Sequence, residues 1–290
     1  MLSHFIVYGA VNSATILLIA LGFSLTFGLT GVANFAHGAF YLLSGYVLWM
    51  LLFTLGVPYL PAVALTILLF ALLGATMYRL IIAPVRGIVL SEVIATFALG
   101  LAILELLRYL GFVTYQFRIP VFARGQMVIL GRSIDYQRIS IVVVAVIVAL
   151  ALWWFTRSTK TGRALRAVSQ DEDTAIALGI RSEWAATISV ALSAGLAAVA
   201  GITILPLGVL SINIGYEAIL IALAATVVGG IESLWGLVAG SAILGFTQTI
   251  AGVVLGEEWA ILVYLVAIVV MLAWRPSGLF GRMHVLEERV

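Results

Sequence analysis

The chain alternates long apolar runs with short polar segments. Apolar runs fall at 5–27, 39–55, 60–82, 88–112, 139–156, 184–206, 217–229, 236–252 and 259–274. Most of them approach the roughly 20 residues that a helix needs to cross a bilayer. The pattern predicts an all-α, polytopic transmembrane fold with eight or nine membrane segments, because 217–229 and 236–252 count as one segment or as two. Residues 1–290 are expected to form a single transmembrane domain.

The composition agrees with a membrane protein. Hydrophobic residues make up 63% of the chain, charged residues 10%, and the mean hydropathy is +1.21, which is too apolar for a soluble protein of 290 residues. The net charge of +2 is spread over the loops, so no nucleic-acid partner is expected. The chain has no cysteine and only scattered histidines, and no metal site or cofactor is predicted. The N-terminus lacks a basic signal-peptide region, so the first apolar run is expected to remain as a span.

Basic residues predict the orientation in the membrane. With the segment 157–183 placed in the cytoplasm, ten of the fifteen basic residues lie inside and five lie in or beside an external loop, 113–138. Parity of the crossings then places the N-terminus outside and the C-terminus inside.

The polar segment 157–183 is the strongest candidate for a partner-binding surface. Ser169 and Glu172 form a capping-box pattern, and Gly179 stands where a helix would end, so a short helix is expected over 170–178. Its apolar side chains would need a protein partner. The residues proposed for this surface are Ser169, Asp171, Glu172, Asp173, Ala175, Ile176, Leu178 and Gly179.

Two polar, glycine-rich stretches interrupt the apolar pattern, at 28–38 and 229–236. Irregular backbone at membrane depth is tolerated only where protein buries it or where it lines a cavity. We therefore expect these stretches either to line a translocation path or to form simple turns at the inner surface. The segment 217–229 is short, which predicts a half-helix or a tilted span. The residues proposed for the path are Asn34, His37, Glu217, Gly229 and Gly230.

Few residues offer chemistry inside the membrane. The chain has no phosphate-binding loop of the Gly-x4-Gly-Lys-Ser/Thr type, so it is not expected to hydrolyse ATP by that chemistry, and no catalytic residues are predicted. Glu105 is expected to pair with Arg108, and Glu92 is expected to sit near the inner interface. Glu217 is the third of these acids, and the hypothesis for it is a role in binding or gating. This scarcity disfavours an ion-coupled secondary transporter.

Five stretches, in order along the chain, resemble the permease subunits of branched-chain amino-acid ABC importers. They read GLTGVANFAHGAFYLLSGYV, APVRG, TGRALRAVSQDEDTAIALGI, VVGGIESLWGLVAGSAILG and RPSGLFG. The resemblance implies a multi-pass protein of the bacterial inner membrane that is surrounded by lipid. It also implies ABC ATPase subunits on the cytoplasmic loop, a second permease of the same or a homologous kind, and a substrate-binding protein on the outer face.

The function expected from these observations is inward transport of branched-chain or related amino acids, driven by ATP hydrolysis in partner subunits. The alternatives are a permease for urea or short-chain amides, an ion-coupled secondary transporter, and a membrane scaffold or receptor.

Overall fold

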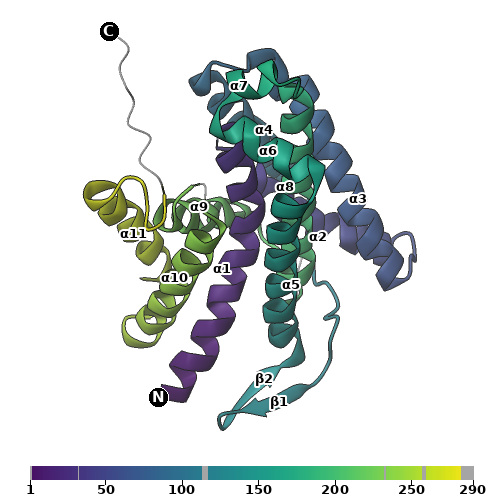
Figure 1. Cartoon of the computed structure of the whole chain (residues 1–290). Helices are drawn as coiled ribbons and strands as arrows, with labels where there is room; N and C mark the ends of the chain where they lie inside the picture. Colours follow the sequence, from purple (N-terminus) through teal and green to yellow (C-terminus); the bar gives the residue numbers. More distant parts are fainter. Residues whose placement is uncertain (1, 32, 113–116, 232, 257–258, 282–290) are drawn as a thin grey trace.

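The protein is a bundle of apolar helices with a small helical cap at one end and a β-hairpin at the other (Figure 1). A computed structural model describes residues 2–31, 33–112, 117–231, 233–256 and 259–281. Its elements are α1 (Leu2–Thr30), α2 (His37–Phe53), α3 (Tyr59–Met77), the π-helical turn η1 (Tyr78–Ile82), η2 (Ala83–Val85), α4 (Val89–Tyr109), β1 (Gln126–Ile129), β2 (Arg132–Asp135), α5 (Tyr136–Ser158), α6 (Lys160–Gln170), α7 (Glu172–Ala177), α8 (Ser182–Ile204), η3 (Leu205–Leu207), α9 (Ile212–Gly229), α10 (Leu234–Val254) and α11 (Ala260–Trp274).

Helix α1 is the centre of the bundle. It packs against α10 and α9 on one side and against α8 and α5 on the other, while α3 packs against α8 at the periphery (Figure 1). The main core is made of aliphatic and aromatic side chains from these helices, among them Leu18, Leu21, Phe23, Leu42 and Leu237. Many other apolar side chains are exposed, as expected of helices that face lipid.

Small residues allow the helices to approach closely. A Cβ atom added at Gly74 of α3 would lie 2.6 Å from the Cβ atom of Ala194 in α8. One added at Gly240 of α10 would lie 2.7 Å from the backbone nitrogen of Gly229 in α9. Both contacts leave no room for a side chain, as in other membrane helix pairs with small residues at the interface.

The predicted all-α transmembrane fold is confirmed. Among the described residues, seven helices are long and apolar enough to cross a membrane, and α2 and α11 are shorter apolar helices of 17 and 15 residues. One boundary was wrong: the segment expected to start at Glu217 starts at Ile212, so α9 has 18 residues. Its first turn was missed because Asn213, Gly215 and Tyr216 interrupt the apolar pattern.

The loop predicted at 113–138 contains a two-stranded sheet that the sequence pattern had not indicated. Residues 113–116 lie outside the described part of the chain, and β1 pairs antiparallel with β2 in the register Gln126 to Asp135. Leu130 and Gly131 form the turn with φ angles of 51° and 76°, a geometry suited to a two-residue hairpin. The hairpin lies at the same end of the molecule as the N-terminus and opposite α6 and α7 (Figure 1).

Candidate functional site

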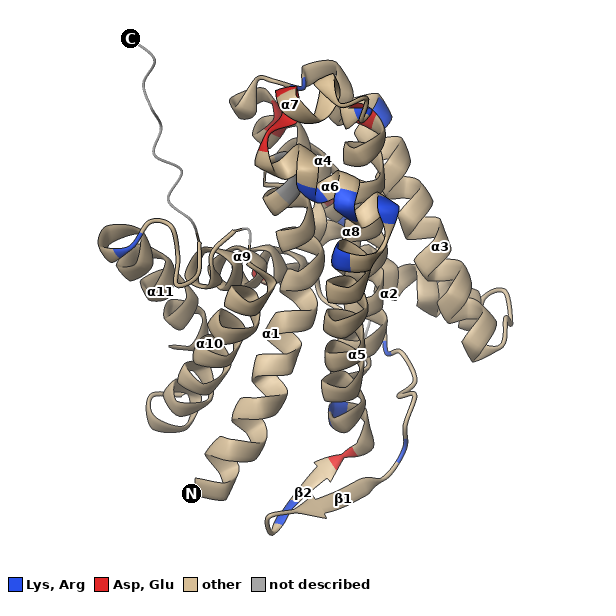
Figure 2. Ribbon diagram, in the orientation of Figure 1, with Lys and Arg blue, Asp and Glu red and all other residues tan. Residues whose placement is uncertain are grey.

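The polar segment between α5 and α8 folds as two short helices rather than one. Helix α6 is amphipathic: Gly162, Leu165 and Val168 are buried, whereas its basic residues are exposed. Leu165 and Val168 form a small separate core with Ala175 of α7 and Ala185 of α8. Figure 2 shows basic residues on α6 and acidic residues on α7, at the end of the molecule opposite the hairpin. The segment is therefore a folded cap on the transmembrane bundle.

The predicted start of the second helix was wrong. We expected Ser169 to cap a helix over 170–178, but Ser169 lies in the last turn of α6, where its hydroxyl donates to the Arg166 carbonyl oxygen over 3.0 Å. Asp171 is the N-cap of α7, because its carboxylate accepts from both the backbone nitrogen and the hydroxyl of Thr174, at 2.9 and 2.6 Å. These bonds from Thr174 favour the charged form and lower the pKa of Asp171. Two bonds to one acid thus outweigh the capping-box pattern.

The residues proposed for the partner surface divide into a buried group and an exposed group. Ala175 is 2% exposed and packs inside the cap, so it does not present itself to a partner. Ile176 and Leu178 are 50% and 77% exposed. Glu172 and Asp173 are exposed beside them, and Gly179 ends the helix with a φ of 84°, as expected. An apolar tip bordered by acids therefore projects from the cap.

Arg86, one of the ten basic residues expected on the cytoplasmic side, contacts this surface. Its Nη2 atom lies 2.6 Å from the Glu172 Oε1 atom. The two residues are 86 positions apart, and no local pattern reveals such a pair. The only signal was the position of Arg86 within the APVRG stretch.

The first interruption, after α1, lies inside the bundle. The His37 Nε2 atom, at the start of α2, is 2.9 Å from the Ile19 carbonyl oxygen in the middle of α1. Helix α1 continues eleven residues beyond Ile19, to Thr30, which is about 16 Å of helix. The chain must therefore turn back along α1 before α2 begins, and the expectation of a simple surface turn is wrong here.

Polar groups hold this irregular segment together. Asn34 and His37 are 2% and 1% exposed, so both are enclosed by the chain itself. The Asn34 side-chain oxygen accepts from the Ala36 backbone nitrogen, and the Asn34 carbonyl oxygen accepts from the His37 backbone nitrogen, at 3.1 and 3.2 Å. The Nδ2 atom of Asn34 and the Nδ1 atom of His37 are buried without a hydrogen-bond partner in the described part of the chain. Buried polar atoms without a hydrogen-bond partner are unusual in a packed protein interior.

Glu217 lies on an exposed face of α9. Glu105 and Arg108 of α4 form the expected ion pair at 3.2 Å. Among the described residues, Glu217 has no such partner.

The second interruption joins α9 to α10 and is held by the chain near the C-terminus. Gly230 has a φ of 102°, and a Cβ atom added there would lie 2.5 Å from the Gly281 backbone nitrogen. The backbone nitrogens of Leu279 and Phe280 donate to the carbonyl oxygens of Val228 and Gly229, at 2.9 and 3.1 Å. Gly229 and Gly230 are thus required for close backbone packing.

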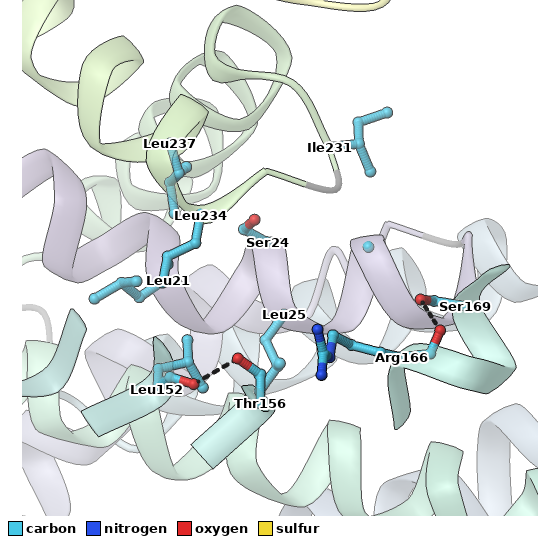
Figure 3. A pocket seen from close by; sticks show the side chains of 11 residues that line it. Leu21, Ser24, Leu25, Leu152, Thr156, Arg166, Ser169, Ile231, Leu234 and Leu237 are labelled. Carbon is cyan, nitrogen blue, oxygen red and sulfur yellow. Dashed lines mark hydrogen bonds between the residues drawn. The ribbon is translucent and has the colours of Figure 1, made fainter. Parts of the chain in front are cut away.

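A cavity of about 130 Å³ is lined by residues of both the cap and this second interruption. Figure 3 shows Arg166 and Ser169 of α6 on one side, Ser24 and Leu25 of α1 between, and Leu234 at the start of α10 on the other. Cap, central helix and α9–α10 connection therefore meet around one space.

Comparisons with known proteins agree with this architecture. Residues 5–273 match the family described as branched-chain amino acid transport system / permease component. The high-affinity branched-chain amino acid transport system permease protein BraD of Pseudomonas aeruginosa is 31% identical, and the match covers 97% of this chain and 96% of that protein. The permease protein LivH of Escherichia coli K12, named for the same high-affinity system, is 30% identical over 96% of this chain and 94% of its own.

A solved structure has a similar fold. The structure titled "PsaBC from Streptococcus pneumoniae in complex with Fab" contains a chain that aligns with a TM-score of 0.52 and 16% identity, covering 96% of this chain and 94% of that one. At this identity the likeness concerns the fold alone.

Proposed function

Because the chain belongs to the family of permease components of branched-chain amino acid transport systems, we propose that it is the membrane-spanning subunit of an ABC importer that moves branched-chain or related amino acids inward. It acts in the bacterial inner membrane. The observation that carries this proposal is the family match over nearly the whole chain. Two relatives named as permeases for these amino acids agree with it.

Energy for transport comes from partner subunits. The chain has no phosphate-binding loop of the Walker type. The exposed apolar tip of the cap, Ile176 and Leu178, with Glu172 and Asp173 beside it, is the docking surface for ABC ATPase subunits. Because α6 packs against α1 and α8, and α7 packs against α8, movement of the cap reaches the transmembrane helices.

The transport path runs along α9 and the start of α2. Glu217 is an exposed acid on an apolar helix, and a charge in lipid is costly unless protein or water covers it. A second permease, the same or homologous, covers this face, and a substrate-binding protein delivers cargo from the outer side. Asn34 and His37 contribute buried polar groups beside the path, and Gly229 and Gly230 hold the inner end of α9 in place.

The docking proposal is tested on the complete importer. Ile176→Asp and Leu178→Asp place charges on the apolar tip without altering the Asp171 cap or the Arg86–Glu172 pair. We expect the double variant to insert normally and to lose co-purification with the ATPase subunits. Leu130→Asp is the matched control, because Leu130 is 63% exposed at the opposite end of the molecule. Full retention of the ATPase by the double variant would contradict the docking proposal.

Reversal of Asp171, Glu172 and Asp173 together is a less specific test, because Asp171 caps α7 and Glu172 pairs with Arg86. The substrate proposal is tested by uptake of leucine, isoleucine or valine in competition with urea and short amides. If only urea or amides compete, the proposed substrate class of branched-chain amino acids is contradicted.

A further inference from the structure

Arg86 is the centre of a polar cluster that joins separate segments of the chain. Its Nη2 atom contacts the Glu172 Oε1 atom at 2.6 Å, at the first residue of α7. Its Nη1 atom donates to the Tyr78 hydroxyl at 3.2 Å and to the Ser182 hydroxyl at 3.5 Å. Tyr78 begins the π-helical turn that follows α3, and Ser182 is the first residue of α8. One side chain therefore connects the cap with the inner ends of two transmembrane helices.

The backbone around Arg86 is held in place independently of this cluster. The Arg86 backbone nitrogen donates to the Ala83 carbonyl oxygen at 3.4 Å. Gly87 has a φ of 90°, and its backbone nitrogen donates to the buried Glu92 carboxylate at 2.8 Å. Arg86 therefore projects from a braced turn, and its position depends little on α7.

Guanidinium geometry suits this arrangement. Arginine carries five donors on a rigid planar group, so two nitrogens can contact different partners at the same time. Lysine has the same charge, but its single ammonium group cannot reproduce the fork. The pair with Glu172 is partly exposed, with side-chain exposures of 24% and 44%, and such pairs add little to stability. What the cluster provides is a fixed geometry.

The cluster lies where the cap meets the transmembrane helices, so a displacement of α7 can reach those helices. Helix α7 otherwise packs against α6 and α8, through Ala175 and the small core of the cap. Through Arg86 it also contacts the turn between α3 and α4. Helix α3 packs along α8, and α8 packs against α1 and α2. π-helical turns such as η1 often occur at functional positions.

We propose that Arg86 is a positioning residue that transmits displacement of α7 to the inner ends of α3 and α8, and so links ATP hydrolysis to substrate movement. The inference depends on the proposed docking of ATPase subunits on the cap.

The test uses the complete importer in lipid vesicles, with the binding protein and substrate supplied. The measured quantity is substrate imported per ATP hydrolysed, together with the amount of ATPase that co-purifies. Arg86→Glu is expected to retain the ATPase and to lower this ratio by at least about fivefold, a typical size for coupling between sites. The coupling ratio of Arg86→Lys is expected to lie between those of the unmodified protein and Arg86→Glu, because lysine keeps the charge and lacks the forked donor geometry of arginine.

Arg79→Glu is the matched control. Arg79 lies in η1, is exposed, and makes no ion pair among the described residues, so its reversal changes the charge near the same membrane end without breaking the cluster. We expect its coupling ratio to stay within about twofold of the unmodified protein. An equal fall in both variants would assign the effect to loop charge and overturn the proposal.

The exchanged pair Arg86→Glu with Glu172→Arg gives a second measurement. Recovery of at least half of the coupling ratio lost in Arg86→Glu would support direct transmission through this contact. An unchanged ratio in Arg86→Glu, or loss of the ATPase from that variant, would overturn it. Failure of the unmodified chain to bind any ATPase would instead contradict the docking proposal.

Discussion

His37 donates a hydrogen bond from Nε2 to the carbonyl oxygen of Ile19, over 2.9 Å, and so joins the beginning of α2 to the middle of α1. A carbonyl oxygen can only accept, so Nε2 carries a proton, and Nδ1 has no hydrogen-bond partner among the described residues. The contact brings the non-helical segment before α2 to the depth of the core.

Two replacements of His37 should distinguish the contribution of its hydrogen bond to stability from the contribution of its size. His37→Gln keeps an NH donor of similar reach, whereas His37→Leu removes it. We expect His37→Leu to lower the free energy of unfolding by about 1 kcal/mol more than His37→Gln, the usual net value of one such bond. Thermal unfolding of the purified permease in one detergent would measure the difference. Equal midpoints for the two variants would show that this bond does not hold α2 in place.

Two glycines of α10 should respond oppositely to the same substitution. At Gly240 a methyl group would meet the Gly229 backbone nitrogen at 2.7 Å, whereas nothing lies within 4 Å of the position at Gly252. Overpacking typically costs about 1–3 kcal/mol, and alanine is the better helix former by roughly 1 kcal/mol. We therefore expect Gly240→Ala to lower the unfolding midpoint and Gly252→Ala to leave it unchanged or raise it. A neutral Gly240→Ala would contradict the close α9–α10 contact.

The cap of α7 should depend on pH in a defined direction. The bonds from Thr174 lower the pKa of Asp171. The N-cap bonds of Asp171 therefore contribute fully to the stability of α7 above the ordinary aspartate pKa of about 3.9, and this contribution is lost as the pH falls through the lower pKa of the folded state. We expect backbone amides of α7 to exchange faster in Asp171→Ala at neutral pH, as measured by hydrogen exchange. Asp171→Asn should keep the cap and lose its dependence on acid pH. Similar exchange in all three proteins would indicate that packing alone holds α7.

Glu217 and Glu105 offer a comparison of two exposed acids in membrane helices. Glu105 has Arg108 as a partner, and Glu217 has no ion-pair partner among the described residues. We expect Glu217→Gln to reduce uptake on the order of tenfold, as for loss of one charge-assisted contact, with ATPase binding retained. Glu105→Gln should change uptake by less than about twofold, because exposed pairs contribute little. Normal uptake by Glu217→Gln would remove this residue from the proposed path.

The sequence alone determined the class of the protein. Lipid requires every backbone polar group of a spanning segment to be paired within that segment, and a helix meets this requirement by itself. The length and composition of an apolar run are therefore enough to predict a membrane helix. The five ordered stretches indicated the permease family, which the family match confirms. Gly179 and the Glu105–Arg108 pair were also predictable, since both depend on neighbours within one helix or turn. The number of crossings and the orientation of the termini stay predictions.

Only the tertiary structure decided which distant residues meet. Asp171 and not Ser169 caps α7, because α6 continues to Gln170 and keeps Ser169 helical, and the two helices then pack together around Leu165 and Ala175. The depth of the break before α2 follows from the contact of His37 with Ile19, and the Arg86–Glu172 pair from the folding of the cap onto the α3–α4 turn. Sequence patterns report the face and the ends of a helix. The contacts between helices depend on shape complementarity across the whole bundle, which no local pattern contains.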